Sequence, residues 1–309
     1  MVRRRDLAGF SHYQVTGELL RNVSEVMQVT EIEVGSALHE LKRRGLPYKY
    51  DLNIYRGCTN GCKYCYAVKS HSYLGLESFN QEVVVKTNIA DRLEKELSST
   101  NWKKEIINIG GVCDSYQALE KQYQLMRQVL KVMIKYKNPI IISTKSDLIL
   151  RDLDLLDELA GHTYVNAALS ITSADENIAK MVEPGASSPY LRFKALREID
   201  KTKAYTGFHL MPILPFLADD EATLETLVSW AAEAKADYML TGMLYLTGGI
   251  KSRYLSFIKQ YYPEYFASYS TLYPKGGADK DYKSKVHGYL SKMRLKYNVN
   301  NRYSKFLPK

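Results

Sequence analysis

Three of the four cysteines in this chain lie within the segment YRGCTNGCKYCYA, which spans residues 55–67. Cys58, Cys62 and Cys65 follow the spacing CxxxCxxC, which brings three soft thiolates onto one short loop. Such a loop can hold three corners of an iron–sulfur cube and leave the fourth iron open to another ligand. Disulfides between near neighbours would constrain very little chain, so we expect a reducing compartment and metal binding.

Two other uses of these cysteines stay open. A structural zinc site is usually four-coordinate, so Cys113 or a histidine such as His71 would have to complete it. The three thiols could instead be buried and inert, although buried cysteines are usually single. Three cysteines at this spacing directly after an expected strand favour cluster binding over both alternatives.

The elements that must position this loop show the pattern of β/α units. From residue 48 onward, short apolar runs alternate with longer amphipathic segments. The expected strands cover residues 48–55, 106–111, 140–146, 165–172, 207–214 and 238–244, and the expected helices cover residues 88–99, 118–136, 152–160, 189–200 and 220–234. Ser188 before Pro189 is a candidate N-cap, and Asp219 or Asp220 could cap the last of these helices. About six units in a row imply a parallel sheet.

Polar and glycine-rich stretches follow the strands: RGCTNGC after the first, GGVCDS after the second, TKSD after the third and TSADE after the fourth. In β/α barrels the loops at the strand C-termini build the active site. We therefore predict an α/β fold, a partial (β/α)6 TIM-type barrel over residues 48–248. An N-terminal strap with one helix (residues 34–45) would occupy residues 1–47, and a helical extension would occupy residues 249–309.

The C-terminal extension is basic and rich in tyrosine. Residues 250–309 hold 13 lysines and arginines against 3 acidic residues, and 10 of the 25 tyrosines. One helical stripe consists of Tyr282, Val286, Tyr289, Leu290, Met293 and Tyr297, with Lys283, Lys285, Lys292, Arg294 and Lys296 mainly on the other side. Cationic surfaces with aromatic rings suit DNA or RNA strands. An internal apolar face fits the same stripe equally well.

The overall composition is that of a globular protein, with 45% apolar and 25% charged residues among 309. No window approaches the roughly 18 consecutive apolar residues of a membrane span. The basic N-terminus lacks the apolar stretch of a signal peptide. We therefore expect a soluble, cytoplasmic protein with no membrane partner.

The CxxxCxxC motif, with Tyr64 before its last cysteine on the loop after the first barrel strand, resembles the radical S-adenosylmethionine (SAM) enzymes. The blocks NIYRGCTNGCKYCYA, VVVKTNIADRLEKEL, GGVCDSYQALEKQYQLMR, ISTKSDLILRDLDLL, SITSADENIAKMVEPGASSP and MPILP, in this order, resemble the spore photoproduct lyase-like branch, which is of the DNA-repair-photolyase type. The resemblance covers about residues 35–235.

The resemblance implies that Cys58, Cys62 and Cys65 ligate a [4Fe-4S] cluster whose open iron binds SAM. An external electron donor would drive cleavage of SAM to methionine and a 5′-deoxyadenosyl radical, which abstracts a hydrogen atom from the substrate. The branch implies a lyase acting on a nucleic-acid lesion or base. The same chemistry on a peptide or small molecule, or a non-catalytic iron–sulfur or zinc-binding protein, stays an alternative.

The resemblance also implies where SAM binds. Gly110, Gly111 and Asp114 fall where the superfamily contacts the methionine amino group. Lys145 and Ser170 match positions that contact the carboxylate and the ribose. Independently of the family, a lysine at a strand end is a suitable point-charge partner for a carboxylate.

Three residues are candidates for catalysis. Tyr64 and Tyr66 flank Cys65 like tyrosines that are linked in the lyase to adenine contact and hydrogen transfer, although Tyr66 could simply pack. Cys113 lies in the loop where the lyase carries a hydrogen-donating cysteine. For Cys113 three interpretations stay open: a hydrogen donor, a metal ligand, or a small buried residue.

Weaker signals come from four other positions. Lys86 and Asn88 match a family block and would either contact substrate or begin a helix. Glu183 begins a Glu-Pro-Gly turn and is a secondary candidate for a cofactor or substrate contact. His209 lies on an expected strand, where a histidine with a hydrogen-bond partner in the core is the commoner outcome.

Overall fold

The computed structural model describes residues 27–42, 45–74, 78–303 and 307. Its strands are β1 (Gln28–Ile32), β2 (Leu38–Glu40), β3 (Tyr50–Leu52), β4 (Tyr55–Arg56), β5 (Glu82–Lys86), β6 (Ile107–Ile109), β7 (Ile140–Thr144), β8 (Val165–Ser170), β9 (Tyr205–Ile213) and β10 (Tyr238–Met243). Its α-helices are α1 (Ile89–Leu97), α2 (Glu120–Tyr123), α3 (Leu125–Tyr136), α4 (Leu153–Ala160), α5 (Glu176–Val182), α6 (Pro189–Ile199), α7 (Glu221–Glu233), α8 (Gly248–Tyr261), α9 (Phe266–Leu272) and α10 (Lys280–Tyr297). Further 3-10 turns cover Tyr66–Leu74, Asp147–Asp152 and Pro263–Tyr265.

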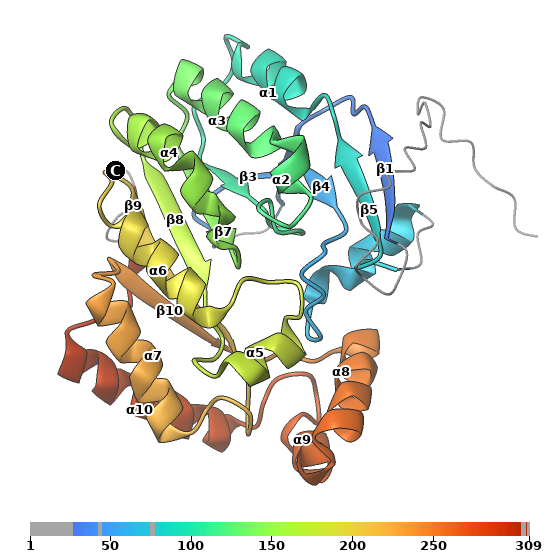
Figure 1. Ribbon diagram of the computed structural model, residues 1–309, viewed down its shortest axis with the longest axis vertical. Helices are drawn as coiled ribbons and strands as arrows, with labels where there is room; N and C mark the ends of the chain where they lie inside the picture. The colour runs from blue at the N-terminus through green and yellow to red at the C-terminus, as the bar shows by residue number, and fades with distance from the viewer. Residues whose placement is uncertain (1–26, 43–44, 75–77, 304–306, 308–309) are drawn as a thin grey trace, which may run out of the picture.

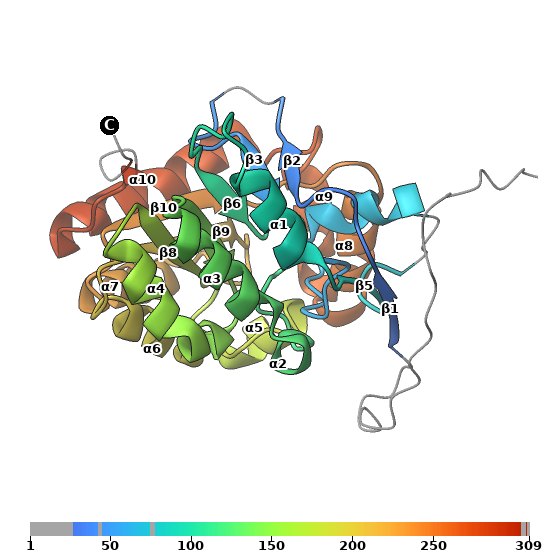
Figure 2. The ribbon, with the colours of Figure 1, turned by 90° about the horizontal axis from the view of Figure 1, so that it is seen from above.

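The main sheet has the order β10-β9-β8-β7-β6-β3-β2. All neighbours from β3 to β10 are parallel, and β2 is added antiparallel to β3 at one edge. Figure 1 shows α1, α3, α4, α6 and α7 following one another along the outside of these strands, and Figure 2 views the same arrangement from above. Six parallel strands with helices outside confirm the predicted partial (β/α)6 barrel.

Local sequence explains most of these elements. The run Ile140–Thr144 is mostly β-branched and mostly buried, as expected of a central parallel strand. Ser188 caps α6 by accepting a hydrogen bond from the N–H of Leu191, with Pro189 at the first helical position, as predicted. Of the two candidates for α7, Asp220 is the residue that accepts from Thr223 N, at 3.0 Å.

The predicted helix over residues 34–45 was wrong: within it, Leu38–Glu40 form β2. The carboxylate of Glu96 on α1 accepts hydrogen bonds from the backbone N–H groups of Ala37 (2.7 Å) and Leu38 (3.0 Å). These contacts fix the chain in an extended form beside β3. Tertiary contacts therefore override a helix-like pattern in the sequence.

The predicted single helix over residues 118–136 is divided at Gln124, whose φ is 50°. The buried carboxylate of Glu120 accepts from Leu125 N (3.1 Å) and Met126 N (3.0 Å) at the start of α3. A carboxylate at a helix N-terminus satisfies backbone donors that have no partner within the helix, so the break is compensated.

A second, three-stranded sheet has the order β1-β5-β4. Strand β4 is antiparallel to β5 and leads directly into the cysteine segment, while β1 is parallel to β5. This small sheet therefore fixes the start of the cysteine segment against the barrel. No helix within the described part of the chain is long and apolar enough to cross a membrane.

Candidate active site

The cysteine loop (residues 57–65) follows β4 at the carboxyl end of the barrel strands. Cys58 and Cys62 are buried, with 8% and 9% of their surface exposed, and all four cysteines of the chain are free thiols. The N–H of Cys58 donates to Phe79 O (3.0 Å), and the N–H of Cys65 donates to Cys62 O (3.2 Å). The loop is therefore a fixed part of the fold.

A turn at residues 182–187, here called the brace turn, holds the cysteine loop from the other side. Lys63 N donates to Val182 O (2.9 Å), and Gly185 N donates to Asn60 O (3.0 Å). A Cβ atom on Gly185 would lie 2.1 Å from the carbonyl oxygen of Thr59, so only glycine fits here. The Glu-Pro-Gly turn expected from the sequence is thus present and packs directly on the loop.

Glu183 anchors the brace turn through a buried ion pair. Its Oε2 lies 2.6 Å from Nη1 of Arg192, and both side chains are 1% exposed or less. Its Oε1 accepts hydrogen bonds from Thr172 Oγ1 (3.0 Å) and from the Tyr64 hydroxyl. Burial raises the pKa of Glu183, but the charges of Arg192 and Lys145 outweigh it and leave the pKa below its usual value.

A cavity of about 470 Å³ opens beside the cysteine loop and extends into the barrel. Most of the predicted site residues line it: Cys58, Cys62, Cys65, Tyr66, Gly110, Gly111, Cys113, Asp114, Lys145 and Ser170. Tyr64 lies outside this lining and packs partly buried against the apolar cluster that includes Val182 and Ile250. The structure therefore brings together ten of the eleven residues predicted for the site.

Each thiol of the loop has a group nearby that favours its ionised form. Burial raises the pKa of Cys62 to about 12, and the Lys145 ammonium opposes this rise. Burial likewise raises the pKa values of Cys58 and Cys65, but the N–H of Asp114 opposes it at Cys58, and those of Ala67 and Val68 oppose it at Cys65. Backbone N–H groups directed at sulfur also tune iron–sulfur centres.

Asp114 connects the cysteine loop to the end of β7. Its carboxylate accepts four hydrogen bonds, from Asn60 Nδ2 (2.9 Å), Tyr116 N (3.0 Å), Thr144 Oγ1 (2.7 Å) and Lys145 N (2.8 Å). Its acceptor capacity is thus used within the protein. The Lys145 ammonium remains in the cavity wall and lies 5.9 Å from the centroid of the Tyr64 ring.

The glycine pair after β6 exposes backbone to the cavity. Gly110 has φ 90°, which side chains rarely tolerate. A Cβ on Gly111 would lie 2.4 Å from Oδ2 of Asp51, so a side chain fits there only if the Asp51 carboxylate moves. Tyr66, 69% exposed at the cavity edge, donates from its hydroxyl to Gly111 O.

Cys113 lies behind the loop, 4% exposed, and its Sγ donates to Tyr55 O at 3.0 Å. Burial raises its pKa to about 12, which keeps it as a thiol. Among the described residues, no three cysteine, histidine or acidic side chains converge closely enough for a single metal ion. The side chain of His71 lies outside the described part.

The weaker candidates have other partners. Lys86 Nζ donates to Asn53 O (2.6 Å), and burial lowers its pKa. Asn88 binds the backbone of Val34 with both amide atoms (2.9 and 3.1 Å), so it anchors the N-terminal strap. His209 is buried and has a hydrogen-bond partner, but it also lines the cavity.

Sequence reasoning missed Asn60, Arg192, Asn166 and Tyr238. Asn60 lies between the cysteines, so its position in the motif could have marked it. Asn166 and Tyr238 line the cavity from β8 and β10. The period-2 pattern of a strand could have assigned them to one face, but it does not show that this face borders a cavity.

The tyrosine stripe of α10 faces the protein interior. Tyr282 donates to Asp219 Oδ2 (2.5 Å), and Tyr297 donates to Glu225 Oε1 (2.8 Å). Val286 and Leu290 are buried beside them. Of the basic residues, Lys283, Lys285 and Lys292 are exposed as expected. The expected outward position of Arg294 was wrong, because its Nη2 donates to Thr241 Oγ1 (2.9 Å) on β10.

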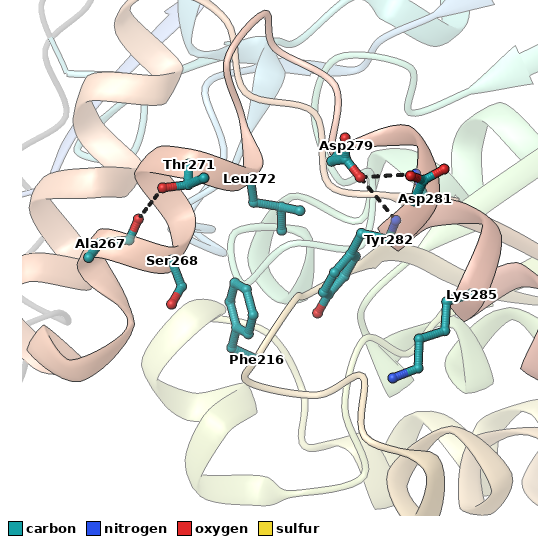
Figure 3. Close-up of a pocket in the computed structure, with 9 residues that line it drawn as sticks. All are labelled: Phe216, Ala267, Ser268, Thr271, Leu272, Asp279, Asp281, Tyr282 and Lys285. Carbon is teal, nitrogen blue, oxygen red and sulfur yellow. Dashed lines mark hydrogen bonds between the residues drawn. The ribbon is translucent and has the colours of Figure 1, made fainter.

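A hollow of about 780 Å³ lies between α9 and the start of α10, away from the cysteines. Figure 3 shows the rings of Phe216 and Tyr282 beside each other on its wall, with Asp279 bonded to the first N–H groups of α10. None of the predicted site residues lines it. The chemistry-bearing residues thus gather in the smaller cavity at the barrel mouth.

Comparison with known proteins identifies the class to which this barrel belongs. The sequence pattern of the Radical SAM superfamily matches residues 52–249. The protein Mb2609c of Mycobacterium bovis is 32% identical over 250 residues, which make up 80% of this chain and 74% of that protein. The chain therefore belongs to the radical SAM superfamily, and it is an enzyme of that class.

Solved structures give a more particular likeness in fold. A spore photoproduct lyase complexed with dinucleoside spore photoproduct matches with a TM-score of 0.64 at 16% identity, over 87% of this chain and 79% of that one. A mutant of the same lyase with bound AdoMet and dinucleoside spore photoproduct matches with a TM-score of 0.62 at 16% identity, over 87% and 78% of the two chains. The expected resemblance to this branch is confirmed for the fold.

Proposed function

We propose that Cys58, Cys62 and Cys65 hold a [4Fe-4S] cluster and that the adjoining cavity binds SAM for radical chemistry on a nucleic acid. The observation that carries the proposal is that three free thiols, each near a cation or backbone N–H donors, border one cavity. When bound and reduced by an external donor, such a cluster cleaves SAM to methionine and a 5′-deoxyadenosyl radical that abstracts a hydrogen atom.

The residues around the cavity have complementary groups for SAM. The Lys145 ammonium is suited to the SAM carboxylate, the side-chain-free strand end at Gly110 and Gly111 to the amino group, and Ser170 to the ribose. Asp114 positions these groups rather than binding SAM, because its four hydrogen bonds hold the Lys145 backbone and the cysteine loop.

Tyr66 and Cys113 are the candidates for contact with the reacting atoms. Both line the cavity, Tyr66 at its edge and Cys113 on its wall. Cys113 carries its proton toward Tyr55 O, so it has an S–H bond that could supply a hydrogen atom to a substrate radical. Tyr64 would act indirectly, by holding Glu183 and lying beside Lys145.

Two observations support a nucleic-acid substrate. The fold matches a lyase that was solved with a dinucleoside, and the C-terminal segment carries exposed lysines on α10. Counterion release makes affinity for DNA or RNA fall steeply as salt rises. Binding that weakens between 50 and about 200 mM salt is expected, and no binding at low ionic strength would rule out this substrate class.

The radical chemistry is tested by anaerobic reconstitution with iron and sulfide, then reduction in the presence of SAM. We expect 5′-deoxyadenosine from the wild type and a loss of at least about a hundredfold in Cys65→Ala, because one cluster ligand is removed. Retained production in Cys65→Ala would contradict the ligand assignment. The iron content of Cys113→Ala tests whether Cys113 is a fourth cluster ligand. If it is a ligand, this variant loses its iron; if it is a hydrogen donor or a buried structural residue, the iron is retained.

A further inference from the structure

The side chain of Arg192 joins the brace turn to the end of strand β8. Its Nη1 donates to Ser170 O at 2.8 Å, and its Nε donates to Ser187 O at 2.7 Å. The same Nη1 forms the ion pair with Glu183, at 2.6 Å. Arg192 is 1% exposed, and all three contacts lie outside its own helix, α6. A planar guanidinium suits such a junction, because it holds its donors in a fixed geometry.

The brace turn extends this junction to the end of strand β7. Ser187 N donates to Lys145 O at 3.1 Å. The Ser187 hydroxyl donates to Oδ1 of Asp147 (2.5 Å) and accepts from Asp147 N (3.0 Å). Arg192 therefore holds the backbone of Ser170 directly and that of Lys145 through Ser187. These are the two residues proposed above for the ribose and the carboxylate of SAM.

The other half of the ion pair reaches the cysteine loop. Glu183 accepts a hydrogen bond from the hydroxyl of Tyr64, and the Lys145 ammonium lies 5.9 Å from the centroid of the Tyr64 ring. The Glu183 carboxylate is in direct contact with Arg192, whereas Lys145 forms no ion pair with an Asp or Glu side chain among the described residues. An ammonium group in this situation is available to the carboxylate of a ligand.

We propose that the buried pair of Glu183 and Arg192 is a positioning unit for SAM. It holds Lys145 and Ser170 at the separation that the carboxylate and the ribose of SAM require. This inference rests on the proposed function and adds two residues to it. Neither residue is among those that line the cavity, so both act through the groups they hold and not by touching SAM. A purely structural pair would affect SAM binding only as far as its loss destabilises the fold.

Two variants separate positioning from stability. Glu183→Gln leaves the Arg192 charge buried without a partner, whereas Glu183→Gln combined with Arg192→Met removes both charges. The double variant should be more stable in urea than Glu183→Gln, because no unpaired charge remains buried. Its affinity for SAM should nevertheless be no higher than that of Glu183→Gln, because the contacts of the guanidinium with Ser170 and Ser187 are lost as well.

Calorimetric titration of SAM into the full-length, cluster-reconstituted protein without reductant gives the dissociation constant, and iron analysis gives the fraction of molecules that hold a cluster. We expect SAM to bind about tenfold or more weakly to both variants than to the wild type. Leu290→Ala is the control for lost stability, because Leu290 is buried on α10 and does not line the cavity. This control should bind SAM within about twofold of the wild type.

Three results would overturn the positioning role: a double variant whose SAM affinity equals that of the wild type, one whose affinity recovers together with its stability, or an equal loss of affinity in Leu290→Ala. A double variant without iron would also overturn it, because the pair would then act on cluster ligation. No SAM binding by the cluster-loaded wild type would overturn the proposed function itself, and the positioning role with it. The failures of the two claims are therefore distinguishable.

Discussion

The cysteine loop and helix α10 both concentrate reactive residue types at regular spacing, yet the structure uses them in opposite ways. The thiols of Cys58, Cys62 and Cys65 border a cavity. The hydroxyl groups of Tyr282 and Tyr297 instead donate hydrogen bonds to carboxylates, on the loop before α7 and on α7 itself. Residue type and spacing therefore indicate chemistry only where the polar groups remain available to a ligand.

The largest effect on stability is expected at the ion pair between Glu183 and Arg192, which anchors the brace turn beside the cysteine loop. Glu183→Gln should lower the free energy of unfolding by roughly 3 to 5 kcal/mol, because it leaves the Arg192 charge buried without its counter-charge. Urea denaturation measures the loss. Glu198→Gln, which breaks the exposed pair with Lys201, is the matched control and should be nearly neutral. Equal, small losses in both variants would show that the brace turn is not anchored in this way.

Stability should also depend on pH through His209, which belongs to the cavity. Its pKa in the folded protein is about 4, compared with an ordinary value of 6.5, because of burial and the charge of Lys145. Between these pH values the unfolded chain binds a proton that the folded protein does not, so stability falls as pH falls through this window. The loss should be on the order of 3 kcal/mol.

Urea denaturation at pH 7 and near pH 4.5, for the wild type and His209→Phe, measures the contribution of His209 to this loss of stability. The variant should lose less stability on acidification than the wild type. Identical pH slopes in the two proteins would contradict a buried neutral histidine.

A smaller effect is expected where the brace turn touches the cysteine loop. Gly185→Ala places a methyl group against the Thr59 carbonyl, so it should cost about 1 to 3 kcal/mol and reduce the iron retained after reconstitution. Gly35→Ala is the control, because a Cβ there meets no atom within 4 Å. Full iron retention in both variants would separate the brace turn from the cluster site.

The smallest effect on stability is expected in the tyrosine stripe of α10. Tyr282→Phe removes the hydrogen bond to Asp219 and should cost about 1 kcal/mol of stability. Its affinity for single-stranded DNA should stay within twofold of the wild type, whereas Lys283→Ala and Lys285→Ala together should reduce the salt dependence. A selective loss of DNA affinity in Tyr282→Phe would mean that the tyrosine stripe binds bases after all.

Much of the barrel could be predicted because its signals are local. Buried parallel strands such as Ile140–Thr144 begin with a run of β-branched apolar residues, and Ser188 with Pro189 marks a helix start within two positions. The cysteine motif is equally local, since all three thiols lie within eight residues. Such features depend on neighbours in sequence, which is why sequence reasoning reaches them.

The features that the sequence did not predict depend on partners that are distant in the chain. Tyr238 meets Asn166 across 72 positions, and Tyr282 meets Asp219 across 63. The extended chain at Leu38 is held by Glu96 from α1, against its helix-like pattern. Only the folded structure decides which of several equally suitable side chains faces a cavity and which faces a carboxylate.

The central claim is that the three thiols hold a cluster with one iron open to SAM. Electron paramagnetic resonance of the anaerobically reconstituted, reduced protein, with and without SAM, tests it most directly. A [4Fe-4S]⁺ signal that changes on addition of SAM, and that is absent in Cys65→Ala, is the predicted result. A cluster signal that SAM leaves unchanged would contradict the claim, because it would show a closed coordination sphere.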